Sequence, residues 1–210
     1  MGHCENNSSD RRLGKYWERM FCWLAAQIGL WFTPMQIGHN GSARAYSRNG
    51  RWASLTLPDI TIWTFPGQHH EIKHKNPTRY NSFGLERYRL NALLMFAEET
   101  RQDVMYTIHN HDLSGGWLAK NNDIDHWVTV NVQDLDGTWT FEGRFPSWVN
   151  GTKKTVLQYF WPVDYWQPLK AYWADYGDSG QVSEQIRSHR DVGLHSESLM
   201  LPGANPTDFT

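Results

Sequence analysis

Two acidic residues and a lysine in the first half of the chain have the types and spacing that suit a divalent cation and a phosphodiester. Asp59 follows a proline, and the triplet Glu71-Ile72-Lys73 begins twelve residues later. Hard cations such as Mg²⁺ take carboxylate oxygens as ligands, lower the pKa of a bound water and stabilise charge on a phosphate. A lysine beside the cation orients or deprotonates the attacking water, or stabilises the developing anion.

The residues around this trio predict two strands joined by a tight turn. Residues 60–65 are rich in β-branched and aromatic types, Pro66-Gly67 is a turn signal, and residues 69–75 predict a returning strand. Pairing of these strands brings Asp59 close to the first acid of the triplet. Side chains two apart on a strand share a face, so three charged residues point the same way: Glu71, Lys73 and Lys75. The alternative is a solvent-facing ladder of charges that stabilises a hairpin modestly.

Helical patterns flank the two strands. Residues 10–26 carry apolar side chains at helical spacing, with Gly29 near the expected end. Residues 81–100 predict a second amphipathic helix that Ser82 caps. Its expected buried stripe is Leu85, Leu90, Leu93, Leu94 and Ala97. Residues 103–109 alternate as a further strand beside the motif strands.

The Pro-Asp and Glu-x-Lys pattern, in this order of helices and strands, resembles the PD-(D/E)xK nucleases of the restriction-endonuclease-like superfamily. The resemblance covers about residues 10–112. It implies an α/β fold with a restriction-endonuclease-like core, a mixed central β-sheet flanked by helices, and further strands toward the C-terminus. It also implies hydrolysis of DNA phosphodiester bonds with Mg²⁺ or Mn²⁺, and it allows a homodimer.

The resemblance further implies roles for individual residues. The catalytic residues are Asp59, Glu71 and Lys73; the metal ligands are Glu18, Asp59, Glu71 and the carbonyl of Ile72; the substrate-binding residues are Lys75, Arg87 and Tyr88. Read without the family, Glu18 is a solvated helix residue paired with Lys15 or Arg19. In the same way Arg87 and Arg89 belong to the exposed face of an amphipathic helix, and for Arg89 this is the favoured interpretation.

Charge and composition limit the other classes of protein. The 210 residues carry a net charge of −2, but residues 1–100 hold 12 Lys or Arg and 8 Asp or Glu, whereas residues 101–210 hold 8 and 14. A locally basic first half suits a phosphate backbone. The basic residues nearest the motif are Arg44, Arg48, Arg51, Lys73, Lys75 and Arg79. The sequence has no run of 18 apolar residues, so no membrane span is predicted, and no signal peptide is expected. Cys4 and Cys22 are expected to be free thiols in a reducing cytoplasm.

The remaining segments predict a hairpin on each side of the motif region and little else that is specific. Asn49-Gly50 predicts a turn between strands at 43–47 and 52–57, and residues 127–132 and 139–142 predict a second hairpin. His109 and His111 share a strand face, as two ligands of a metal site would, but the sequence offers no third ligand at a suitable spacing.

One domain is expected over residues 1–176, followed by a mobile tail at 177–210. The aromatic segment 159–173 is expected to pack on the sheet; its alternative is a surface that stacks on bases or sugars. Two other functions therefore stay open beside the nuclease: a non-catalytic module that binds nucleic acid or a partner on a nuclease-like fold, and a carbohydrate-binding protein.

Overall fold

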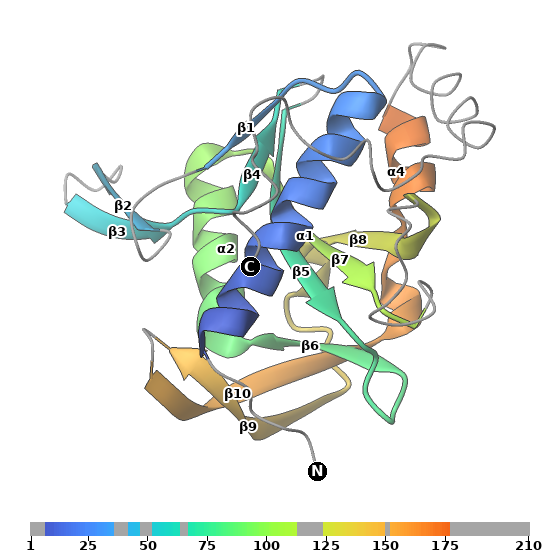
Figure 1. Ribbon diagram of the computed structural model, residues 1–210. Coiled ribbons are helices and arrows are strands. Elements are labelled where there is room, and N and C mark those ends of the chain that lie inside the picture. Colours follow the sequence, from blue (N-terminus) through green and yellow to red (C-terminus); the bar gives the residue numbers. More distant parts are fainter. Residues whose placement is uncertain are drawn as a thin grey trace.

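A six-stranded mixed sheet forms the centre of the molecule (Figure 1). The computed structural model describes residues 7–35, 42–46, 52–63, 67–112, 124–149 and 152–176. In spatial order the strands of the sheet are β1 (Phe32–Pro34), β4 (Ile60–Ile62), β5 (Gln68–Lys75), β7 (Asp103–Asn110), β8 (Trp127–Asn131) and β11 (Gln167–Pro168). β5 and β7 run parallel, and the other neighbours are antiparallel. The prediction of a mixed α/β fold is therefore confirmed.

Each face of this sheet carries its own apolar core, because successive side chains of a strand point to opposite faces. On one face α1 (Asn7–Gln27) and α4 (Leu169–Tyr176) pack their apolar side chains against Ile60 and Ile72 of the sheet. On the other face α2 (Arg87–Thr100) packs against Tyr106 and its neighbours. The first helix spans the predicted range and ends at Gln27; Gly29 follows it with a positive φ of 75° and donates its amide to Ala26 O at 3.0 Å.

A second sheet, with the order β6-β10-β9, completes the core on the α2 face. Its strands are β6 (Ser82–Glu86), β9 (Phe141–Val149) and β10 (Thr152–Pro162). The prediction of a helix over 81–100 was wrong at its start, since the first six residues lead into and form β6. Ser82 is consequently a strand residue and no helix cap, and Leu85 lies opposite Tyr159 of β10. This pairing with a distant strand overrides the local helical pattern.

The predicted hairpin between 127–132 and 139–142 was also wrong. β8 pairs with β7 and β11, and a short helix, α3 (Val132–Leu135), follows it directly. β9 begins at Phe141 and pairs with β10 instead. The expected packing of segment 159–173 is confirmed for six of its seven Trp, Tyr and Phe side chains, which are buried: Tyr159, Phe160, Trp161, Trp166, Tyr172 and Trp173. Two short 3₁₀ turns, Ile124–His126 and Val163–Tyr165, precede β8 and β11.

The expected strand pair ahead of Asp59 is present as β2 (Ser42–Tyr46) and β3 (Trp52–Thr56), which pair antiparallel. Its turn, with Arg48, Asn49-Gly50 and Arg51, lies outside the described residues, as do Cys4, Pro66 and the tail 177–210.

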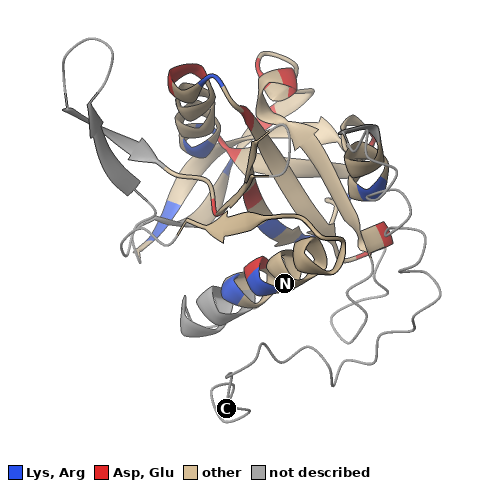
Figure 2. Ribbon diagram, turned by 90° about the horizontal axis from the view of Figure 1, so that it is seen from above, with Lys and Arg blue, Asp and Glu red and all other residues tan. Residues whose placement is uncertain are grey.

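The described helices were compared for hydropathy and for the distribution of their charged residues. No helix in the described part of the chain is long and apolar enough to cross a membrane. Figure 2 shows Lys and Arg alongside Asp and Glu on the described parts of α1 and α2.

Candidate active site

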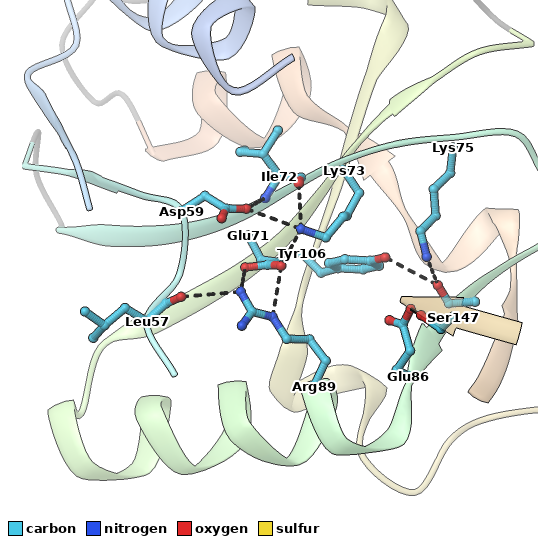
Figure 3. A network of polar contacts seen from close by, with 11 residues as sticks. Leu57, Asp59, Glu71, Ile72, Lys73, Lys75, Glu86, Arg89, Tyr106 and Ser147 are labelled. Carbon is cyan, nitrogen blue, oxygen red and sulfur yellow. Dashed lines mark hydrogen bonds and ion pairs between the residues drawn. The ribbon is translucent and has the colours of Figure 1, made fainter. Parts of the chain in front are cut away.

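The β4–β5 register brings the predicted acids and lysine together. Ile60 lies opposite His70, so the residue before β4, Asp59, comes level with Glu71. The backbone amide of Ile72 donates a hydrogen bond to Asp59 Oδ2 at 2.8 Å, which fixes the acid against β5 (Figure 3). The predicted convergence of these side chains at one end of the strand pair is thus present in the structure.

The ammonium group of Lys73 lies among three oxygen atoms of this cluster. Its Nζ is 2.5 Å from Glu71 Oε1, 3.0 Å from the Ile72 carbonyl oxygen and 3.5 Å from Asp59 Oδ2. Glu71 is fully buried, whereas the side chains of Lys73 and Asp59 are 36% and 20% exposed. The cluster is therefore closed to solvent at Glu71 and partly exposed at Lys73 and Asp59.

Arg89 of α2 is the site residue that the sequence interpretation missed. Its Nε donates to Glu71 Oε1 at 2.9 Å, and its Nη2 donates to Glu71 Oε2 and, at 3.3 Å, to the carbonyl oxygen of Leu57 (Figure 3). The prediction that Arg89 lies on an exposed helix face was wrong, since only 17% of its side chain is exposed. Helical periodicity assigned Leu90 to the buried stripe and the neighbouring Arg89 to the exposed face. The signal that could have identified Arg89 is that a buried glutamate needs a countercharge.

The charges of this cluster determine its pKa values. Burial raises the pKa of Glu71, but the charges of Lys73 and Arg89 outweigh burial and lower that pKa to about 2. Burial and the Glu71 charge raise the pKa of Asp59 to about 6. Burial opposes ionisation of Lys73, yet the two acids raise the pKa of its ammonium above the ordinary value. Glu71 and Lys73 are consequently both charged at neutral pH, while Asp59 titrates close to it.

Glu18 of α1 is electrostatically part of the same cluster. Burial first, and then the charge of Asp59, raise the pKa of Glu18 to about 7, and Glu71 and Lys73 also act on it. Acids that raise one another's pKa are characteristic of a place where a cation is favourable. Lys15 also acts on Glu18 and lowers its pKa, so a metal-binding role for Glu18 stays a prediction beside the alternative of a helix ion pair.

The donors of this cluster fit a divalent cation in type. Asp59, Glu18, Glu71 and the carbonyl of Ile72 are all oxygen donors, which Mg²⁺ and Mn²⁺ prefer. In the described ranges no three His, Cys, Asp or Glu side chains already converge as a metal-binding group. Instead the Lys73 ammonium occupies the position between Glu71, Asp59 and the Ile72 carbonyl. The Lys73 ammonium thus lies among the oxygen atoms that would be ligands of a metal ion.

The three predicted substrate-binding residues lie in different surroundings. Lys75 turns away from Lys73: its ammonium donates to the Gly84 carbonyl of β6 and lies 5.6 Å from the centre of the Tyr106 ring. Burial lowers the pKa of Lys75. Arg87 and Tyr88, at the start of α2, are exposed, with Tyr88 48% accessible. The contact of these three residues with substrate stays a prediction.

His109 and His111 lie on the α1 side of the sheet with His74. His74 Nδ1 and His109 Nδ1 are 3.0 Å apart, and both rings stack on Trp17. Burial lowers the pKa of His74 to about 4 and that of His109 to about 3, so both are neutral at pH 7. These rings are not among any metal-binding group in the described residues, and their stacking on Trp17 is ordinary core packing.

Comparison with known proteins gives likenesses to solved structures alone. No family model matches the chain, and no curated protein matches it. Among solved structures, Archaeoglobus fulgidus Hjc, a Holliday junction resolvase from an archaeal hyperthermophile, is similar with a TM-score of 0.39 and 11% identity, over 70% of this chain and 82% of that chain. A likeness of this degree decides nothing about activity, so an inference about function must rest on the side chains around Asp59.

Proposed function

We propose that this protein is a nuclease that hydrolyses DNA phosphodiester bonds with Mg²⁺ or Mn²⁺. One observation carries the proposal: Asp59, Glu71 and the Ile72 carbonyl surround the Lys73 ammonium at a solvent-accessible end of the β4–β5 pair. A buried acid, a second acid near its titration point and a charged lysine in one opening are the groups that hydrolysis of a phosphodiester requires. A binding surface alone has no need of all three.

Each residue has a distinct role in this proposal. Asp59, Glu71 and the Ile72 carbonyl hold the cation, together with Glu18, and the cation supplies charge stabilisation and an activated water when it is bound. Lys73 is displaced from the oxygens toward the open side, where its ammonium orients the attacking water and stabilises charge on the phosphate.

Three further residues are proposed to contact the DNA backbone: Lys75, Arg87 and Tyr88. The exposed Arg87 and Tyr88 lie in the first turn of α2, the same turn from which Arg89 contacts Glu71, so phosphates bound near this end of the helix would come within their reach. Lys75 contributes from the end of β5 once it releases the Gly84 carbonyl. These contacts position the substrate and carry no base specificity.

The decisive experiment is cleavage of supercoiled, linear, single-stranded and branched DNA in Mg²⁺, Mn²⁺ or EDTA. The wild type is compared with Lys73→Ala and with Lys154→Ala, a matched removal of an exposed lysine on β10. We expect cutting in either metal, none in EDTA, none by Lys73→Ala, and an unchanged rate for Lys154→Ala. Absence of cutting of all four substrates by the wild type would overturn the nuclease proposal.

A second function is supported by one specific observation: Glu71 is held by both Arg89 and Lys73, and no metal-binding group is already assembled in the described residues. This favours a nuclease-like fold that binds nucleic acid without cutting it. The same experiment separates the two functions, since the binding module retains DNA in EDTA and Mg²⁺ alike and never nicks it. The carbohydrate alternative loses support, because the aromatic segment is buried.

A further inference from the structure

Arg89 connects the two chain segments that carry the acids. Its guanidinium contacts both oxygens of Glu71 on β5, and its Nη2 also donates to the carbonyl oxygen of Leu57, two residues before Asp59 (Figure 3). One planar group on α2 thus contacts the strand with one acid and the segment with the other. Lysine cannot reproduce this arrangement, because its ammonium is a point charge without the fixed fork of donors.

The surroundings of Arg89 make this arrangement rigid. The Arg89 side chain is 17% exposed and Glu71 is fully buried, so water competes little for these hydrogen bonds. Leu57 is itself 7% exposed and belongs to the apolar core beneath α2, together with Leu90 and Leu93 of that helix. A paired guanidinium between two such fixed elements restricts how far the Leu57–Asp59 segment can move from β5.

We propose that Arg89 is a positioning residue that holds Glu71 and Asp59 at the separation needed for cation binding and hydrolysis. The proposal rests on the nuclease function proposed above. In this role Arg89 acts through Glu71 and through the Leu57 carbonyl, the two groups with which its guanidinium forms hydrogen bonds. Without it, Glu71 keeps the Lys73 ammonium as its countercharge, and Asp59 is joined to β5 by the amide of Ile72 and by the longer contact with Lys73.

The kinetic test compares the wild type with Arg89→Ala, Arg89→Lys and the control Arg144→Ala, which removes an exposed arginine of β9. For Arg89→Ala we expect kcat to fall about 100-fold while KM for DNA stays within about threefold, because a group that acts only on the cation ligands leaves substrate binding intact. Added methylguanidinium should restore at least a tenth of the lost rate. Arg89→Lys should lie between wild type and Arg89→Ala.

A measurement without DNA or metal tests whether Arg89 holds the Leu57–Asp59 segment against β5, which we call the brace. The Ile72 amide donates to Asp59 Oδ2, so movement of the Leu57–Asp59 segment exposes that amide. Hydrogen exchange at Ile72 should be at least tenfold faster in Arg89→Ala, whereas exchange at Ile108, inside β7 of the same sheet, should match the wild type. Arg144→Ala should change neither amide. If Arg89→Ala does not fold, Arg89→Lys takes its place in both measurements, with a smaller effect in the same direction.

The outcomes keep the two proposals apart. A wild type that cuts DNA and an Arg89→Ala that cuts within threefold of it overturn the positioning role alone. A wild type that never cuts overturns the nuclease function; faster exchange at Ile72 then still supports the brace. Unchanged exchange at Ile72 in both variants overturns the brace whatever the cleavage assay gives.

Discussion

The two faces of β5 handle buried polar side chains in opposite ways. On the α2 face Glu71 is ionised, and the charges of Lys73 and Arg89 compensate it. On the α1 face His70 and His74 are uncharged: burial lowers the pKa of His70 to about 3 and that of His74 to about 4. The α2 face keeps an ionised side chain because two cations compensate its charge, whereas the histidines of the α1 face are neutral and pack against aromatic rings.

This difference indicates which face can do chemistry. The imidazoles that stack on Trp17 are buried and neutral, so they bring no charge that needs a partner. The compensated carboxylates of the other face lie beside a solvent-accessible lysine and acid, where an incoming cation or phosphate can exchange for the existing partners. Variants that change the side chains of one face at a time test this difference.

The largest effect is expected for removal of the lysine. Lys73→Met should lower the rate of metal-dependent DNA cleavage by about 1,000-fold, within the range by which a positioned acid or base contributes. His74→Gln, the next position on the opposite face of the strand, should stay within about threefold of the wild type. Single-turnover cleavage of a labelled duplex measures both. Equal losses for the two variants would contradict the assignment of chemistry to one face.

The next effect is on stability. Arg89→Met should lower the free energy of unfolding by about 3 kcal/mol, because it leaves the buried Glu71 with one countercharge in place of two. Urea denaturation at pH 7.5 gives the value. The double variant Glu71→Gln/Arg89→Met should recover part of the loss, since it no longer buries an undercompensated charge. A double variant less stable than Arg89→Met would contradict the account of compensated charge.

The histidine face should show its own pH dependence. His109 has a pKa of about 3 in the folded protein, below the ordinary 6.5 of the unfolded chain, so the unfolded state binds the proton more tightly. The stability that neutral His109 contributes is complete above pH 6.5 and is lost as pH falls toward 3. His109→Phe, which keeps an aromatic ring against Trp17, should reduce the loss of stability between pH 7 and 4.5 by about 1 kcal/mol.

Urea midpoints at the two pH values measure this change. The control is Lys154→Ala, which removes an exposed side chain of β10 far from the histidines in sequence. A slope that is the same in wild type and His109→Phe would show that another group supplies the pH dependence.

The smallest effect has the opposite sign. Glu18 has a raised pKa of about 7, so its charge disfavours the folded, metal-free protein as pH rises from 4.5 through 7. Glu18→Gln should therefore stabilise the metal-free protein at pH 8 by under about 1 kcal/mol, a figure reduced for the partial exposure of Glu18. The same variant should bind Mn²⁺ more weakly, which calorimetry without DNA measures. Stabilisation that persists at pH 4 would contradict a charge effect.

The part of the site that was predictable is the part encoded locally. Strand alternation and the turn signal placed Asp59 beside Glu71 and Lys73 on one face, and the structure brings these three together. The first helix and its glycine end were equally local. The error at residues 81–86 arose because β6 is a strand only by virtue of its pairing with β10. Arg89 was missed for a related reason: a charged residue on a helix reveals its burial only when its distant partner is known.

The pairing of β6 with β10 also affects when the protein can become competent. Leu85 of β6 pairs with Tyr159 of β10, and Gly84 of the same strand supplies the carbonyl oxygen that accepts the hydrogen bond of Lys75. Contacts of such long sequence separation slow folding, because a large loop must close before they form. On the ribosome the motif strands emerge long before Pro162, the last residue that pairs with β6. We therefore expect that a nascent chain stopped before β10 holds the complete acid–lysine motif without its surrounding structure, and acquires that structure only when synthesis has passed the second sheet.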